Sequence, residues 1–136
     1  MHWPRVFALA VVVPLGLSAA AWARNQQETE TMAEKTQAVW LVRAINTAEM
    51  RYAYDRQGRY GTWQQLWDSG SLKPKSAPNG KLSRSPEPIP GYHLEVLVSS
   101  DGKSYTISLH DMRKGKGLFS VFSDQSGIIF VGAPLQ

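Results

Sequence analysis

The stretch "YHLEVLVSSDGKSYTISLH", residues 92–110, decides the fold, because two runs of alternating residues flank the dipeptide Asp101-Gly102. This dipeptide between alternating runs is typical of a β-hairpin with a two-residue type I′ turn. Such a turn pairs His93 with His110 and leaves the other face of the hairpin mostly polar. The first face then carries a complete apolar set: Leu94, Val96, Val98, Tyr105, Ile107 and Leu109. One face of this hairpin is therefore expected to cover a core.

Two more apolar runs follow the hairpin, "GLFSVFS" at residues 117–123 and "GIIFVG" at residues 127–132. Residues 124–127, with the letters DQSG, separate them and have the composition of a turn. Four strands joined by short turns predict an antiparallel meander with one face available to a helix.

That helix is expected on the N-terminal side, since residues 28–56 contain no proline or glycine. Apolar residues recur there every three or four positions, which places them on one stripe. The stripe consists of Ala38, Leu41, Val42, Ile45, Ala48 and Tyr52. The opposite side is expected to carry Glu34, Lys35, Arg43, Glu49 and Arg51. Gly58 and Gly61 are expected to end the helix.

Residues 24–35 are a separate segment, because residues 27–35 are almost wholly polar. We expect this start of the helix to project from the body or to fray. The body itself is expected to span residues 36–136.

Between the helix and the hairpin, Thr62 is expected to cap a short helix that Gly70 ends. Residues 73–91 contain five prolines, which predict a long, irregular and exposed connection. A long N-terminal helix, an irregular linker and a four-stranded meander together predict an α+β fold.

Residues 1–23 have the features of a secretory signal peptide. Arg5 makes the start basic, an apolar run interrupted by Pro14 and Gly16 follows, and residues 21–23 match the A-x-A cleavage pattern. Cleavage between Ala23 and Arg24 predicts a periplasmic or extracellular protein. Retention of the segment as a membrane anchor is the alternative.

Composition narrows the function classes. A chain of 136 residues is the size of one domain, and its net charge of +4 is too dispersed to predict nucleic-acid binding. The absence of cysteine excludes disulfides, thiolate metal ligands and thiol nucleophiles. No motif for a cofactor, a phosphate or a hydrolytic nucleophile is present, so we expect no cofactor and no enzymatic activity.

The segment "LVRAINTAEMRYAYDRQGRYGTWQQLWDSGSL", residues 41–72, resembles the headgroup of a type IV pilin or a type II secretion pseudopilin. Its end of a helix, its glycine turn and its short Trp/Leu helix are similar to that family, and "FSVFSDQSGIIF" resembles the family's last hairpin. The resemblance implies a pilin-like fold and partners among secretion, pilus or other envelope proteins.

The N-terminus departs from this family. Pilins have a leader ending in glycine, then a methylated aromatic residue and, four residues on, a glutamate that neutralises the neighbouring subunit. Here Gly16 is followed by Leu-Ser-Ala-Ala-Ala-Trp, and no acidic residue precedes Glu28. We therefore expect an exported, non-catalytic structural or interaction protein that does not polymerise by itself. The alternative is a soluble periplasmic module that binds a ligand or a metal.

His93, His110 and Glu95 are the candidates for a metal site, because the predicted register places them on one surface. Two imidazoles and a carboxylate are ligands that zinc or copper accepts. The alternative is a pair of exposed histidines on a polar sheet face.

Trp40, Trp63 and Trp67 form an aromatic concentration around the end of the helix. Aromatic side chains can form a contact surface for sugars or peptides. They can equally close a small core that has few other large side chains.

Overall fold

The computed structural model describes residues 16–73, 75, 77, 82–113 and 119–132. The chain divides into two compact units, Met1–Met32 and Ala33–Gln136. Helix α1 (Gly16–Asp55) contributes residues to both. In the first unit, the side chains described from residue 19 to residue 26, and that of Met32, are exposed. No helix among the described residues is long and apolar enough to cross a membrane.

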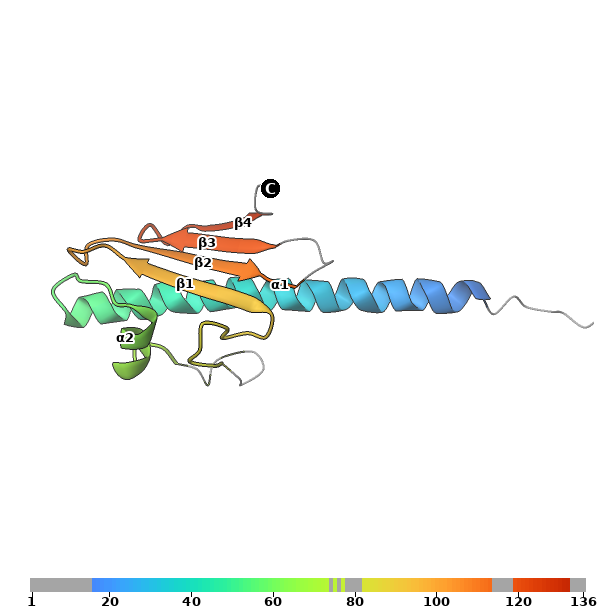
Figure 1. The fold of residues 1–136 in the computed structure, drawn as a ribbon, viewed down its shortest axis with the longest axis horizontal. Coiled ribbons are helices and arrows are strands. Elements are labelled where there is room, and N and C mark those ends of the chain that lie inside the picture. The colour runs from blue at the N-terminus through green and yellow to red at the C-terminus, as the bar shows by residue number, and fades with distance from the viewer. Residues whose placement is uncertain (1–15, 74, 76, 78–81, 114–118, 133–136) are drawn as a thin grey trace, which may run out of the picture. The chain divides into compact units, whose positions relative to one another are not determined.

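The second unit is an α+β domain in which the C-terminal part of α1 packs on a four-stranded antiparallel sheet (Figure 1). The strands are β1 (Tyr92–Val98), β2 (Tyr105–Asp111), β3 (Ser120–Asp124) and β4 (Ile129–Gly132). They pair in sequence order, which confirms the predicted meander. A short helix, α2 (Trp63–Asp68), lies between α1 and the sheet in sequence.

The register of the first hairpin is the predicted one: His93 faces His110 and Val98 faces Tyr105. The type I′ turn is wrong, because Asp101 does not adopt a positive φ. Instead, Gly102 donates its N–H to Ser99 O at 2.8 Å and alone takes φ +71°. The loop between β1 and β2 is therefore longer than expected and spans residues 99–104. It has the same centre as the expected two-residue loop, so the predicted strand pairs are unchanged.

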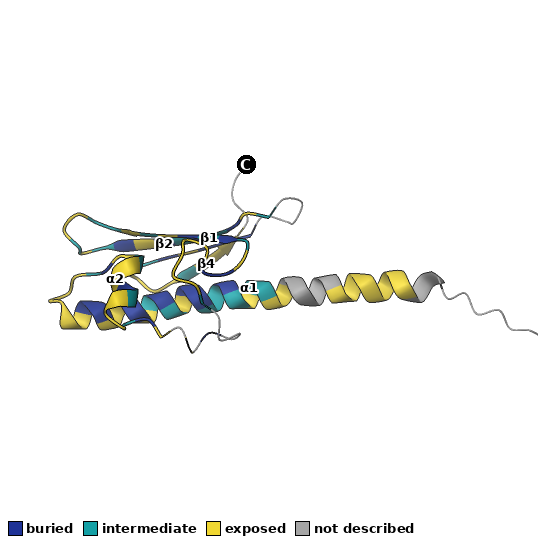
Figure 2. Ribbon diagram, turned by 60° about the horizontal axis from the view of Figure 1, so that its bottom comes forward, coloured by how far each residue is buried: buried dark blue, intermediate teal, exposed yellow. Residues whose placement is uncertain are grey.

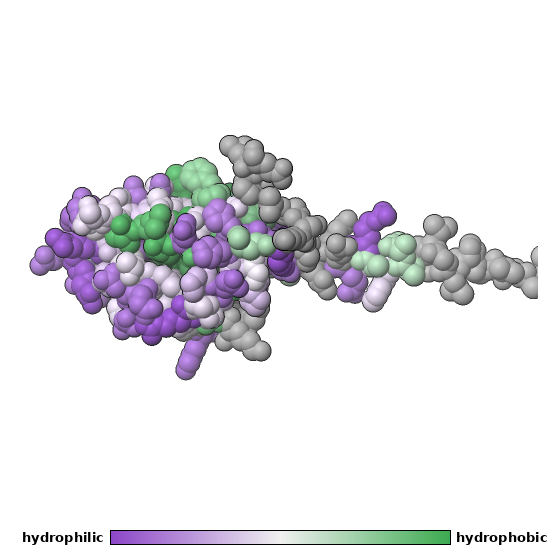
Figure 3. Space-filling model, in the orientation of Figure 1, coloured by the Kyte–Doolittle hydropathy of each residue, from purple (hydrophilic) through white to green (hydrophobic). Residues whose placement is uncertain are grey.

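The core lies between α1 and one face of the sheet. It contains the predicted helix stripe and Tyr105, Ile107 and Leu109 of β2, all less than a tenth exposed. Figure 2 shows the buried side of α1 in the part of the helix beside the strands. The opposite face of the sheet leaves Leu97, Phe122 and Phe130 exposed. Apolar surface accordingly appears around the strands in Figure 3.

The expected polar side of α1 needs three corrections. Glu49 is fully buried, because it lies four residues after Ile45 and three before Tyr52 and so falls on the core stripe. Glu34 and Lys35 are half-buried rather than exposed: Glu34 pairs with Arg113, and the Lys35 ammonium lies 5.4 Å from the Phe119 ring centre.

The capping of α2 follows the prediction, whereas the end of α1 follows it only in part. Gly58, at φ +76°, donates its N–H to Ala53 O at 2.9 Å, as in a helix C-terminal cap, but the preceding residue, Gln57, already takes a positive φ of 57°. The expected role of Gly61 in ending the helix is wrong, because α1 ends at Asp55 and Gly61 does not take a positive φ. Thr62 caps α2, and its side chain and that of Gln65 exchange hydrogen bonds with each other's backbone.

The linker is irregular where it is described, but it is not exposed throughout. Pro88 and Ile89 are buried, and Ile89 belongs to the core. The Trp63 indole donates to Arg84 O at 2.9 Å, and Arg84 forms an ion pair with Asp68. Proline prevents regular structure in a segment but does not prevent its burial.

Candidate functional site

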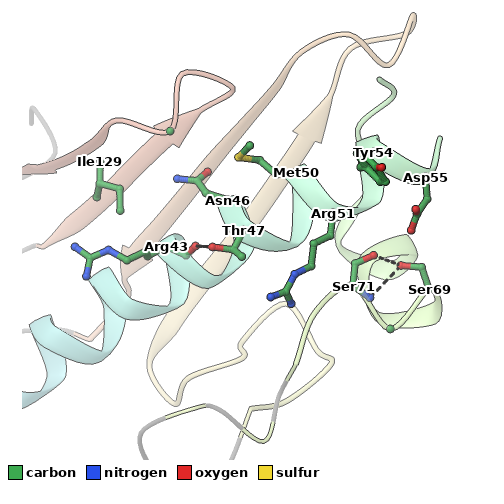
Figure 4. A pocket seen from close by; sticks show the side chains of 12 residues that line it. Arg43, Asn46, Thr47, Met50, Arg51, Tyr54, Asp55, Ser69, Ser71 and Ile129 are labelled. Atoms are coloured by element: carbon green, nitrogen blue, oxygen red, sulfur yellow. Dashed lines mark hydrogen bonds between the residues drawn. The ribbon is translucent and has the colours of Figure 1, made fainter. Parts of the chain in front are cut away.

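An open groove of about 890 Å³, the main groove, runs along one side of α1 (Figure 4). The loop after α2, the β3–β4 turn and β4 complete its lining. The lining residues are Arg43, Asn46, Thr47, Met50, Arg51, Tyr54, Asp55, Ser69, Gly70, Ser71, Gly127 and Ile129.

The helical period makes the groove two-sided. Asn46, Met50 and Tyr54 follow one another at four-residue intervals and form one row along α1. Arg43, Thr47 and Arg51 form the neighbouring row, with the same spacing. Figure 4 shows Asn46 and Met50 toward the side of Ile129, and Arg51 toward the side of Ser69 and Ser71.

Met50 and Tyr54, the two apolar members of the first row, are poorly covered by the protein itself. Met50 is 71% exposed and Tyr54 is 90% exposed. A methionine and a tyrosine in adjacent turns of a helix gain little from the fold when they are left in water. Contiguous exposed apolar patches, rather than single exposed side chains, are typical of surfaces that contact another molecule, and Met50 and Tyr54 are neighbours one helical turn apart.

The neighbouring row is cationic. Arg43 and Arg51 are exposed, and neither forms an ion pair with another described residue. A smaller groove of about 410 Å³ extends this surface past Trp40 and Ser71 to Lys73. Asp55 is the acidic residue in the lining of the main groove, at the C-terminal end of α1.

Glu49 lies beneath this surface but does not reach it. Its Oε2 accepts a hydrogen bond from the Gly61 N–H at 2.8 Å, whereas its Oε1 is buried without a partner among the described residues. Burial raises the pKa of Glu49 to about 7, although the Gly61 hydrogen bond lowers it. Such a carboxyl is held as a structural link between α1 and the turn that follows it.

A second polar cluster joins α1 to the end of β2. The Arg113 guanidinium binds both carboxylate oxygens of Asp111 at 2.8 Å and Glu34 Oε1 at 2.7 Å, and also donates to the Tyr92 hydroxyl at 3.2 Å. Both carboxylates raise the pKa of Arg113. Burial, together with the nearby Asp111, raises the pKa of Tyr92. Since every group in the cluster has a partner, its role is structural.

The structure places the candidate metal ligands on two neighbouring strands without joining them. His93 and His110 are Cα partners, as predicted, and Glu95 is exposed two positions along β1. However, His110 Nδ1 bonds Ser120 Oγ at 2.9 Å, and its ring packs edge-on against Phe122. Among the residues with a described position, no three His, Asp or Glu side chains are grouped as metal ligands.

The same hydrogen bond pairs a histidine with a serine, as in hydrolytic sites. Here, though, Ser120 is fully buried, so its hydroxyl is not presented to a substrate. We assign this pair to packing between β2 and β3.

The tryptophans pack against the core. Trp63 and Trp67 contact each other edge to face, with their ring centroids 5.7 Å apart. These two residues and Trp40 are half-buried against the core cluster. Trp40 also lines the smaller groove.

Ala23 and Arg24, the predicted cleavage pair, lie within α1 and are exposed.

Sequence reasoning did not find the main groove. The signal was present, since Met50 and Tyr54 are spaced four apart and lie off the core stripe. The two walls of the groove come from segments far away in sequence, which a helical pattern cannot predict.

No family model, curated protein or solved structure matches the chain.

Proposed function

We propose that this protein is a non-catalytic interaction protein of the cell envelope with a pilin- or pseudopilin-like headgroup. The observation that carries the proposal is the groove on α1, whose exposed Met50 and Tyr54 lie beside two arginines without ion-pair partners among the described residues. This surface offers contacts to another molecule and holds no pair of groups suited to acid–base or nucleophilic chemistry.

Two further features support a pilin-like headgroup. A long helix that packs through one stripe on a four-stranded antiparallel meander is the arrangement the resemblance implies. The glycine turn and short Trp/Leu helix after α1 are also present, as Gly58 and α2. We propose contacts with secretion or pilus components through the groove or through the open edges of the sheet.

The proposed location rests on the sequence of residues 1–23, with a basic start, an interrupted apolar run and Ala-Trp-Ala. Mass spectrometry of the protein recovered from the cell envelope and the medium tests it. A mature N-terminus at Arg24 is expected. An intact N-terminus would instead support the anchored alternative.

Site-specific photo-crosslinking in producing cells tests the interaction role. A photoreactive residue at Thr47 probes the groove and one at Phe130 probes the sheet edge, with exposed Gln64 on α2 as the matched control. Adducts with other proteins are expected at Thr47 or Phe130 and not at Gln64. Light-dependent adducts at none of the three positions would contradict the proposed function.

We further propose that the protein does not polymerise alone, because residues 27–35 are almost wholly polar where the core of a pilin filament would need an apolar helix. The chain from Arg24 onward should elute as a monomer or a small oligomer in size-exclusion chromatography. Filaments of that chain in electron micrographs would show otherwise.

A ligand- or metal-binding module is the second candidate, favoured by the facing pair His93 and His110. Calorimetric titration with zinc and with copper tests it. Binding lost in both His93→Ala and His110→Ala would support the module, and binding that survives either change would indicate a nonspecific surface effect.

A further inference from the structure

We infer that the groove on α1 binds an acidic amphipathic helix of a partner protein, with apolar residues on the Met50 and Tyr54 row and carboxylates on the Arg43 and Arg51 row. This inference rests on the proposed interaction role and names the chemistry of the partner.

The length of the groove matches a helical segment. Its lining residues on α1 extend from Arg43 to Asp55, and at about 1.5 Å rise per residue this stretch is about 18 Å long. A helix of about 12 residues has the same length and makes contact through about three turns. An extended peptide offers only alternate side chains to one surface, so it matches two parallel rows at helical spacing less well.

Charge complementarity defines the polar side of the partner. Arg43 and Arg51 are two turns apart on one row, so carboxylates spaced seven or eight residues apart on a partner helix can face both. Arginine pairs with carboxylates through two parallel hydrogen bonds, which makes the contact directional as well as attractive.

The apolar side supplies the area that is removed from water. Met50 is unbranched and adapts to irregular partner surfaces, and Tyr54 presents a rigid ring with a polar tip. Half-buried Ile129 of β4 forms the wall beside this row. Leucine or similar residues at helical spacing on the partner would be covered there.

The experiment uses the full chain and three synthetic 14-residue helical peptides of defined composition. The first carries leucines on one stripe and glutamates beside it. The second replaces the glutamates by lysines, and the third replaces the leucines by serines. Fluorescence anisotropy of the labelled peptides gives each Kd at low and at physiological salt.

The glutamate–leucine peptide is expected to bind at least tenfold more tightly than either of the others, and more weakly as salt rises. The double variant Arg43→Glu/Arg51→Glu should bind the glutamate–leucine peptide at least tenfold more weakly than the unmodified protein. Met50→Ser should weaken binding of the same peptide at both salt concentrations. The matched control is Arg59→Glu, because Arg59 is exposed and lies outside the groove. This control should bind as the unmodified protein does.

Equal binding of the glutamate and lysine peptides, or unchanged binding by the doubly reversed variant, would overturn the inference. Binding to vesicles containing phosphatidylglycerol that is lost in Arg43→Glu/Arg51→Glu, without binding of the acidic peptide, would overturn it in favour of a membrane surface. Photo-crosslinking separates this failure from that of the proposed function. Adducts at Phe130 without peptide binding would show that the groove is not the contact site, while the proposed interaction role would stand.

Discussion

At the residue scale, Glu49 shows how one buried carboxyl connects two elements. Its Oε2 accepts the Gly61 N–H, and Gly61 also lies close to the ring of Tyr52. The buried Tyr105 has its pKa raised by burial and by the nearby Glu49. The turn after α1 is therefore positioned by a carboxyl that the fold favours in its neutral form.

We predict that Glu49 makes stability fall with rising pH. Its pKa in the folded protein is about 7, above the ordinary 4.5, so its contribution is complete below about pH 4.5 and is lost as the pH rises through about 7. This difference between the two pKa values corresponds to roughly 3 kcal/mol of unfolding free energy. Urea unfolding between pH 4.5 and 8 measures it. The difference in unfolding free energy between wild type and Glu49→Gln should change across this range, whereas a constant difference would contradict the prediction.

Gly61 has a distinct requirement, which is space rather than backbone conformation. A Cβ on Gly61 would lie 2.9 Å from Tyr52 Cε1. Gly61→Ala should therefore destabilise the domain by about 1–3 kcal/mol, because the ring or the turn must move. Gly132→Ala is the control, since a Cβ there meets nothing within 4 Å. Thermal unfolding compares the two, and equal losses would refute the steric explanation.

At the element scale, the phase of α1 determines both the core and the groove. Ile45 is fully buried beneath the sheet, while Arg43, two residues earlier, is exposed in the groove. A rotation of the helix by one residue would exchange parts of these two surfaces. Sheet packing therefore fixes which side chains a partner meets.

We predict that Ile45→Asp unfolds the domain, because a buried carboxylate without a partner is not tolerated. Arg43→Asp should change the unfolding free energy by less than about 0.5 kcal/mol, as expected for an exposed position. Circular dichroism during heating measures both variants. A melting temperature for Ile45→Asp equal to that of wild type would be incompatible with this helix phase.

At the scale of the whole molecule, the described hydrophobic core lies within the unit Ala33–Gln136. Every described residue of the core cluster lies between Ala38 and Val121. The described side chains of residues 19–26 and of Met32 are exposed and add nothing to that core.

We predict that a chain starting at Ala33 melts within about 3 °C of the full chain, because it keeps the whole core and the Glu34–Arg113 ion pair. Scanning calorimetry of the two chains measures this. A chain starting at Val39 would lose Glu34, Lys35 and Ala38 and serves as the destabilised reference. A loss in the Ala33 chain as large as in that reference would show that residues 1–32 contribute to the fold.

The sequence by itself determined the elements, because periodicity and turn chemistry are local. Alternation around Asp101-Gly102 predicted the hairpin register, the three-to-four spacing predicted the buried stripe of α1, and Thr62 predicted the cap of α2. Even the wrong turn type did not affect the register, since the actual loop has the same centre.

Only the tertiary structure decided the environment of single polar groups and the shape of the surface. Glu49 lies on the buried stripe of α1, but only the turn after the helix supplies its hydrogen-bond partner, the Gly61 N–H, and Glu34 is half-buried where Arg113 reaches it from the end of β2. The groove exists because Ser69–Gly70–Ser71 border α1 on the side of Arg51, while the β3–β4 turn and β4 border it on the side of Asn46 and Met50. The two hydrogen bonds join residues separated by 12 and by 79 positions, and a pattern within one segment carries no information about which distant segment packs beside it.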